Sequence, residues 1–266
     1  MSRTPTAAVD RRRDLHTHSD LTDGTASPAA MADAAVAAGL HTWGLSDHVR
    51  ADSDWVDEYL RLVRGLRRDG LEILCGVEAK ILDSRGRLDL PTALPDLDYV
   101  LVADHQYPAA GGPVHPRDVA RAIAAGAMLP ADVVDELVVA TCAAVQRAPL
   151  PVIVAHPFSL LPKMGLSETD VRDDHLRALA AACRTVDAAV EINGKWRCPS
   201  ARIVADLSSA GVDLVAGSDA HRPQDVGAFG YVDVIGAVHQ PGADAPWARP
   251  ADLPSSRRER RVAVSP

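Results

Sequence analysis

The sequence predicts an α/β protein that forms one barrel-like domain. Short apolar stretches with strand character alternate along the chain with helical stretches, and strands that are apolar throughout are typical of a parallel sheet covered on both faces. Seven such strand candidates occur in 266 residues, and α/β barrels often comprise about 250 residues as a single unit. One array of this kind favours closure into a barrel over a division into two domains.

The elements follow one another in a regular order. The first strand is expected at residues 14–19, "DLHTHS", and the first helix at 27–38. Ser27 is a suitable N-cap, Pro28 fits the first helical turn, and Gly39 can end the helix. The later strands are expected at 41–48, 71–80, 97–105, 150–157, 188–194 and 212–221. The later helices are expected at 54–68, 117–125, 131–147, 168–183 and 199–210.

Both ends of the chain differ in composition from its middle. Residues 1–12 are predicted to be a flexible N-terminal tail. Residues 240–266 are rich in Pro, Ser and charge, which predicts a disordered C-terminal tail. The single barrel domain is therefore expected to span residues 13–239.

The composition argues against several classes of function. The net charge is −8, whereas a surface that binds long nucleic acid is basic. No stretch approaches the roughly 18–20 apolar residues of a membrane span, and the N-terminus has no apolar segment typical of a secretory signal. The four cysteines lie far apart, as expected for free thiols in a reducing compartment. We therefore expect a cytoplasmic protein without a membrane span; the oligomeric state is left open.

Nearly every predicted strand ends in a residue that can bind a metal ion. The C-terminal ends of the strands of a parallel barrel meet at one face, so these side chains are expected to share one pocket. His16 and His18 are two positions apart on a strand and therefore project to the same side. Neutral imidazoles together with carboxylates suit Zn, Mn or Fe. The residues at the strand ends are His16, His18, His48, Glu78, His105, His156, Glu191, Asp219 and His221.

The ordered motifs at these strand ends resemble those of the PHP superfamily, which is named for its polymerase and histidinol phosphatase members. The motifs are "DLHTHSDLTDG", "LSDH", "GVEA", "VADH", "VAHP", "EIN" and "GSDAH", and the resemblance covers roughly residues 13–222. It implies a single-domain, distorted (β/α)7 TIM-like barrel and a stand-alone phosphoesterase similar to the histidinol phosphatases. It also implies a centre of two or three divalent metal ions.

The resemblance further implies which residues hold these ions. The first ion would be held by His16, His18, Glu78 and Asp219. Glu78 would bridge to a second ion that is completed by His105 and His156. The third ion would be held by Asp23, His48 and His221. Among the ligands, Glu78, Asp219 and His221 are also expected to be catalytic.

A metal-dependent phosphomonoesterase that acts on a small phosphorylated metabolite is the leading hypothesis. Closely spaced divalent ions supply hydroxide at neutral pH, which would attack the phosphorus in line. Lys195, Arg197 and Arg222 are expected to bind the phosphate, with Lys80 and Lys163 behind them. Trp196 is a candidate for packing against a ring of the substrate, and residues 106–116 are expected to form a lid or rim facing it.

The sequence leaves alternative functions open. The same centre could serve a phosphodiesterase acting on short or cyclic nucleotides, or a hydrolase of C–N or C–O bonds. A non-enzymatic assembly domain is a further alternative, although all nine ligand positions hold competent residues.

Three acidic residues near the predicted site have other expected roles. Glu191 either lines the pocket or makes structural hydrogen bonds. Asp47 and Asp104 are expected to cap a turn or to support the histidines beside them.

Overall fold

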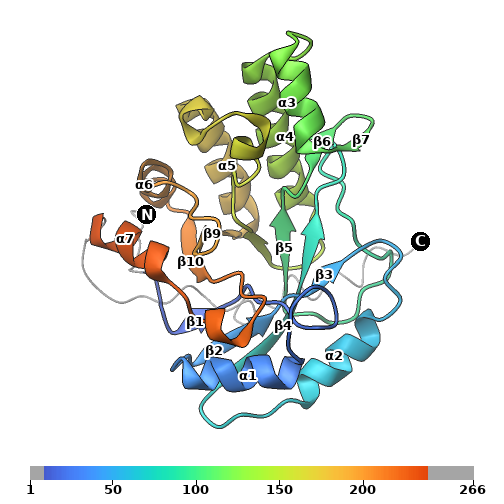
Figure 1. The fold of residues 1–266 in the computed structure, drawn as a ribbon, viewed down its shortest axis with the longest axis vertical. Helices are drawn as coiled ribbons and strands as arrows, with labels where there is room; N and C mark the ends of the chain where they lie inside the picture. Colours follow the sequence, from blue (N-terminus) through green and yellow to red (C-terminus); the bar gives the residue numbers. More distant parts are fainter. Residues whose placement is uncertain (1–8, 239–266) are drawn as a thin grey trace.

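The computed structural model describes residues 9–238, in which seven parallel strand positions form a nearly closed barrel (Figure 1). In sheet order these strands are β1 (Arg13–Asp14), β2 (Thr42–Leu45), β4 (Glu72–Lys80), β5 (Tyr99–Ala103), β8 (Val152–Val154), β9 (Ala189–Asn193) and β10 (Asp213–Gly217). Strand β3 (His48–Val49) extends the position of β2 and also pairs with β4. This architecture confirms the predicted distorted TIM-like barrel.

The barrel closes through a short seam between the first and last strand positions. Thr17 and Ala220 form a parallel bridge there. The His18 N–H donates to the Ala220 carbonyl (2.8 Å), and the Ala220 N–H donates to the His16 carbonyl (3.3 Å). The seam therefore lies directly beside two of the candidate metal ligands.

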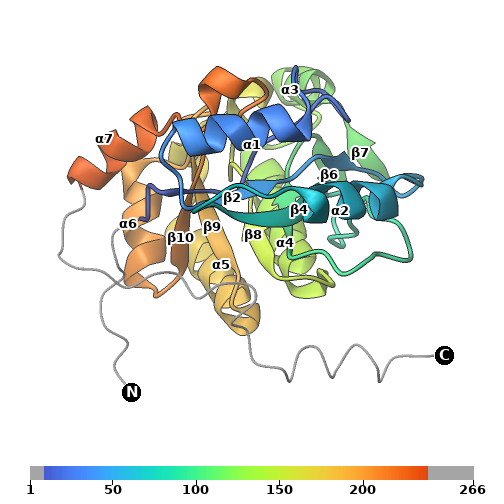
Figure 2. The same ribbon diagram turned by 90° about the horizontal axis from the view of Figure 1, so that it is seen from below.

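The helices surround the barrel. Figure 1 shows α1 and α2 on one side of the strands and α4 and α5 on the other, and Figure 2 shows α6 and α7 beside β9 and β10. Ser27 caps α1 as predicted, since its hydroxyl accepts the Ala30 N–H at 3.3 Å. The α-helices are α1 (Pro28–Ala37), α2 (Val56–Gly65), α3 (Pro116–Ala124), α4 (Pro130–Arg147), α5 (Asp173–Val186), α6 (Ala201–Ser209) and α7 (Gly230–Val238). Single turns of 3-10 helix lie at Leu161–Met164, Glu168–Asp170 and Pro223–Asp225.

The apolar residues form two cores. The larger one packs the helices against the outside of the barrel, and the smaller one fills its interior. Tyr99 is the largest side chain of the inner core; it is fully buried, and its hydroxyl donates to the Leu15 carbonyl at 2.7 Å. The inner core consists of Leu15, Leu74, Tyr99, Leu101, Ala103, Ile153, Ala155, Ala189 and Val215.

Two glycines on neighbouring strands make room for Tyr99. A Cβ atom at Gly44 or Gly76 would overlap the Tyr99 ring or its hydroxyl, and Gly76 lies directly opposite Tyr99 in the β4–β5 register. We expect Gly76→Ala to lower the free energy of unfolding by about 2 kcal/mol, because overpacking a rigid core costs about 1–3 kcal/mol. Thermal denaturation should show a melting temperature lower by about 4–8 °C. Gly111→Ala is the control, since its Cβ would meet no atom within 4 Å; equal melting temperatures would contradict the prediction.

Several segments differ from the sequence-based expectation. Strand β1 is shorter than predicted: its pairing with β2 ends at Asp14, and beyond it the Thr17 N–H donates to the Ser46 hydroxyl (3.2 Å) rather than to a carbonyl of the neighbouring strand. Residues 106–116, expected as a loop, contain a β-hairpin of β6 (Tyr107–Ala109) and β7 (Gly112–Val114). The Tyr107 hydroxyl donates to Glu136 of α4, so the hairpin is fixed to the helix layer. Helix α7 was not predicted.

The described part of the chain includes residues 9–12 of the predicted N-terminal tail, where Asp10 is hydrogen-bonded to His41 at 2.9 Å. The rest of that tail and the predicted C-terminal tail lie outside the described residues.

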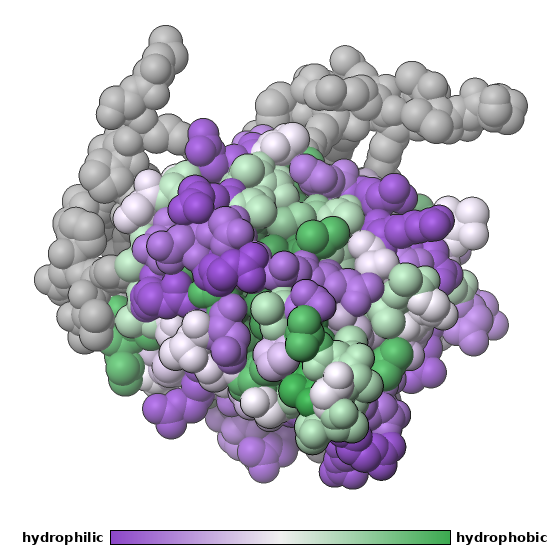
Figure 3. All heavy atoms as spheres, turned by 90° about the horizontal axis from the view of Figure 1, so that it is seen from above, coloured by the Kyte–Doolittle hydropathy of each residue, from purple (hydrophilic) through white to green (hydrophobic). Residues whose placement is uncertain are grey.

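Cys75, Cys142, Cys183 and Cys198 are free, as expected. None of the described helices combines the length and the apolar character that crossing a membrane requires. On the face shown in Figure 3, hydrophobic residues are interspersed with hydrophilic ones.

Candidate metal centre

Glu78, near the end of β4, lies at the middle of the candidate centre and is 1 % exposed. Its Oε1 lies 2.9 Å from His105 Nε2 and 3.0 Å from His156 Nε2. Its Oε2 faces the other side, at 2.9 Å from His48 Nδ1, 3.4 Å from His18 Nε2 and 3.5 Å from His16 Nε2. The two oxygens of one carboxylate thus face two separate sets of imidazoles, which is the arrangement that a bridging ligand needs.

A second group lies at the more exposed side of the centre. Asp23 Oδ2 lies 3.2 Å from His221 Nε2 and 3.4 Å from His48 Nε2. Ligand atoms of these three residues and of His18 all lie within 4.8 Å of one another. This group corresponds to the predicted third ion site, with His18 as an additional neighbour.

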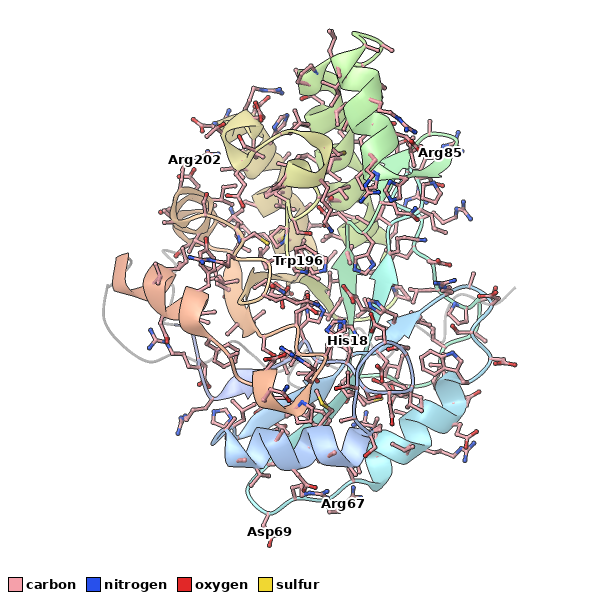
Figure 4. All side chains as sticks on the ribbon, in the orientation of Figure 1. His18, Arg67, Asp69, Arg85, Trp196 and Arg202 are labelled. Carbon is pink, nitrogen blue, oxygen red and sulfur yellow. The ribbon has the colours of Figure 1, made fainter. Side chains whose placement is uncertain are left out.

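Asp219 joins the two regions. Its Oδ1 lies 3.7 Å from His18 Nε2, 3.9 Å from His16 Nε2 and 3.3 Å from His221 Nδ1. The fold therefore brings all nine predicted ligands, from positions 16 to 221, into one cluster. Figure 4 places His18 near the middle of the ribbon and Trp196 close to it, whereas Arg85 and Arg202 lie at the periphery.

The cluster fits divalent metal ions. The buried ring nitrogens His16 Nε2, His18 Nδ1 and His18 Nε2 have no hydrogen-bond partner among residues 9–238. Buried polar atoms normally have such a partner, so two unpartnered Nε2 atoms that both face Glu78 Oε2 require another explanation. Imidazole nitrogens and carboxylate oxygens are suitable ligands for Zn, Mn or Fe.

The charges of the centre shift the pKa values of its members. Burial alone would raise the pKa of Glu78, but the imidazoles of His105 and His16 hold it well below its usual value. Burial alone would lower the pKa of His156, but the Asp104 and Glu78 carboxylates raise it to about 10. Without a bound ion, the Glu78 carboxylate is therefore charged at neutral pH, and the His156 imidazole is protonated.

Zinc affinity is expected to rise with pH for this reason. Nε2 of His156 can bind a metal only without its proton, and below a pKa of about 10 that proton must be displaced. Each displaced proton makes the affinity rise by about tenfold per pH unit, so Zn²⁺ should bind at least about tenfold more tightly at pH 8 than at pH 7. Competition titrations with a chromophoric chelator at both pH values measure this change. An affinity that does not vary with pH would contradict the prediction.

Other side chains support the ligands. Asp47 is buried and accepts hydrogen bonds from the Ser19 N–H (2.8 Å), the Ser19 hydroxyl (2.6 Å) and the Thr22 hydroxyl (2.6 Å). It thereby fixes the turn that carries Asp23. Asp104 lies 3.5 Å from His156 Nδ1. Asp47 thus supports a turn, and Asp104 supports His156 rather than His105, its neighbour in the sequence.

The supporting role of Asp14 was not predicted from the sequence. It is fully buried, and its carboxylate accepts the Ser218 N–H (3.0 Å) and the Gly227 N–H (2.9 Å). These bonds connect the start of the barrel to the segments on both sides of Asp219. The only sequence signal is an acidic residue at the start of a strand, two positions before His16.

The predicted phosphate-binding residues take different positions. Lys195 Nζ lies 3.1 Å from both Asp219 Oδ1 and His221 Nδ1, at the edge of the centre. Arg197 lies over the Tyr231 ring, with 5.7 Å between its Cζ and the ring centroid. Arg222 is exposed and its Nε lies 2.8 Å from an oxygen of Asp225. Within the described residues, neither guanidinium has an ion pair or hydrogen bond with the nine candidate ligands.

An open cavity of about 670 Å³ adjoins the centre. Its lining includes His48, Glu78 and His105 of the centre, as well as Trp55 and Lys80. The cavity therefore leads directly to the carboxylate that faces both sets of imidazoles.

A profile of the PHP domain matches residues 14–149, which span β1 to α4 and carry six of the nine candidate ligands. The chain belongs to the PHP domain family. No curated protein matches this PHP domain protein.

Two solved structures share the fold of this PHP domain protein. One is a putative histidinol phosphatase from Listeria monocytogenes, with 18 % identity and a TM-score of 0.65, covering 83 % of this chain and 99 % of the other. The second is a histidinol phosphate phosphatase from Lactococcus lactis, with 16 % identity and a TM-score of 0.60, covering 85 % and 94 %. That second protein was solved in complex with zinc, L-histidinol and phosphate. At these identities the likeness concerns the fold.

Proposed function

We propose that this PHP domain protein is a metal-dependent phosphoric ester hydrolase, and more specifically a phosphomonoesterase that acts on a small phosphorylated metabolite. The observation that carries the proposal is the position of Glu78, whose two oxygens face two sets of imidazoles. A carboxylate that bridges two ions is a common feature of multinuclear hydrolytic centres. Family membership and the zinc and phosphate bound in the Lactococcus lactis protein support the same class of reaction.

The centre would hold two or three divalent ions. His16, His18, Glu78 and Asp219 would form the first site, Glu78, His105 and His156 the second, and Asp23, His48 and His221 the third. When bound, such ions lower the pKa of a coordinated water and neutralise charge on phosphoryl oxygens. Glu78, Asp219 and His221 would orient the reacting groups, because they lie between neighbouring sites.

Lysine side chains support an anionic substrate. The chain contains only three lysines. Lys195 lies at the edge of the centre, Lys163 Nζ lies 4.0 Å from the ring centroid of Trp196, and Lys80 lines the adjacent cavity. Their gathering around one site favours phosphate binding by ammonium groups. Arg197 and Arg222 would need to leave Tyr231 and Asp225 to take part.

Replacing Lys195 with methionine is expected to raise the KM for a phosphate monoester by about 10–100-fold, because a charge-assisted hydrogen bond is worth about 1.5–3 kcal/mol. Steady-state kinetics on the metal-loaded protein measures the change. Arg85→Met, at the exposed periphery, is the control and should leave KM unaltered. An unchanged KM in Lys195→Met would remove Lys195 from the phosphate-binding residues.

The proposed function is tested with a panel of small substrates. Protein purified without chelator and loaded separately with Zn²⁺, Mn²⁺ or Fe²⁺ is assayed with phosphate monoesters, phosphodiesters, short or cyclic nucleotides, and lactones. Faster turnover of monoesters supports the proposal. Turnover of diesters alone would assign the protein as a phosphodiesterase, and cleavage of lactones alone would assign hydrolysis of non-phosphate bonds.

The proposed setting of the protein is cytoplasmic, which the four free thiols support. The net charge of −8 supports a small substrate over long nucleic acid.

A further inference from the structure

Glu191, in the middle of β9, contacts two of the candidate metal ligands although it is not itself one of the nine. It is 1 % exposed. Its Oε1 lies 2.8 Å from His16 Nδ1, and its Oε2 accepts the backbone N–H of His156 at 2.6 Å and the Asn193 side-chain amide at 3.1 Å. A buried carboxylate is tolerated only when donors replace its lost hydration, and these three contacts do so.

The contact with His16 determines which ring nitrogen is free to bind a metal. An ionised carboxylate only accepts hydrogen bonds, so the His16 proton must lie on Nδ1. In the neutral imidazole, Nε2 then carries a lone pair. This Nε2 is the atom that points to the centre, at 3.5 Å from Glu78 Oε2. Glu191 therefore selects the tautomer that exposes the metal-binding nitrogen.

The contact with His156 stabilises an unusual backbone conformation. His156 has a φ of +27°, a region that non-glycine residues rarely adopt. Such a conformation persists only when its surroundings fix it. The bond from the His156 N–H to Glu191 is one such constraint, and it orients the segment that directs the His156 ring toward Glu78.

Gly217 at the end of β10 leaves the space that Glu191 needs. A Cβ atom at Gly217 would overlap the Oε1 of Glu191, the oxygen that contacts His16. The Glu191 carboxyl group is enclosed by the neighbouring strand and cannot move away freely. A glycine at this position is therefore required for the contact.

We propose that Glu191 is a positioning residue of the metal centre, which fixes His16 through its tautomer and His156 through its backbone, with Gly217 providing the room. The proposal rests on the metal centre described under the proposed function. It deepens that function, because a single carboxylate from β9 links ligands that belong to two different ion sites.

The test compares Glu191→Gln with the unaltered protein, using Zn²⁺ alone as the probe. The Gln amide can donate to His16 Nδ1, which moves the His16 proton to Nε2 and blocks the metal-binding atom. Zinc affinity, measured by chelator competition, is expected to fall by about 10–100-fold. Glu72→Gln is the matched control, since Glu72 is a hydrogen-bonded glutamate at the opposite end of β4; its zinc affinity should be unchanged.

Gly217→Ala gives an independent second variant, which displaces Glu191 without altering its charge and should weaken zinc binding in the same direction. A ¹⁵N spectrum of the histidine side chains provides a signature that a purely structural role would not change. In the zinc-loaded protein the His16 proton is expected on Nδ1, and in Glu191→Gln on Nε2.

The possible results separate this inference from the proposed function. If Glu191→Gln binds zinc as tightly as the unaltered protein, or keeps the His16 proton on Nδ1, the positioning role is overturned even where phosphate esters are cleaved. If the unaltered protein cleaves no ester but Glu191→Gln binds zinc more weakly, the proposed function fails and the positioning role stands.

Discussion

Replacing His16 and His18 together with alanine is expected to lower phosphatase turnover by at least about 10³-fold. Both imidazoles are almost fully buried, and their Nε2 atoms lie 3.5 and 3.4 Å from the same oxygen of Glu78. Their loss would remove two ligands of the first ion site, and electrostatic stabilisation by a metal is worth several kcal/mol in the transition state. Turnover and bound zinc, measured by elemental analysis, should decrease together.

The matched control is the double variant His41→Ala and His115→Ala, which also removes two imidazoles. His41 and His115 lie outside the centre, directly before β2 and directly before α3. The control should keep its turnover. Circular dichroism should show that both double variants retain the helices and strands of the barrel. Retained turnover in the His16 and His18 variant would reject the assignment of the site.

Removal of the metal by a chelator is expected to abolish turnover and to lower the melting temperature by about 5–10 °C. A ligand that binds only the folded protein at a concentration of 100 times its Kd stabilises it by about 2.7 kcal/mol. For a chain of this length, each kcal/mol corresponds to about 2–4 °C. Without ions, the buried Nε2 atoms of His16 and His18 would also be left without a partner. Differential scanning calorimetry and a turnover assay measure the two effects.

Restoring the ions one kind at a time identifies the metal. Zn²⁺, Mn²⁺ and Fe²⁺ should each restore the melting temperature to some degree, because six of the nine candidate ligands are imidazoles. Mg²⁺ prefers oxygen ligands in octahedral geometry and should restore much less. Full turnover in protein from which every divalent ion has been removed would rule out metal-dependent chemistry.

Much of the site could be predicted because its signals are local. Nearly every predicted strand is apolar and ends in a metal-competent residue, so the strand pattern placed eight of the nine candidate ligands on one face of a barrel, and the resemblance to the PHP superfamily added Asp23. The parallel order of the strands and the helix capped by Ser27 also followed from short stretches of sequence. These features depend on neighbours in the chain or on a general rule of the fold.

The missed features depend on distant partners. Asp14 is fixed by Ser218 and Gly227, which are 204 and 213 residues away. Strands β6 and β7 have only three residues each and are stabilised by the contact of Tyr107 with α4, so periodicity could not reveal them. The side chain of Arg197 is oriented by its contact with the Tyr231 ring, and that of Arg222 by its ion pair with Asp225. Side-chain orientation of this kind is decided by tertiary structure.

The seam that closes the barrel has a consequence for local unfolding. Two backbone hydrogen bonds, among His16, His18 and Ala220, join the first strand position to the last there. Opening the seam would separate His16 and His18 from Asp219 and so dismantle the ion sites. By linkage, any ion held across the seam must raise the free energy of that opening. The metal would thus act as a cross-link between the two ends of the barrel, in addition to its part in the reaction.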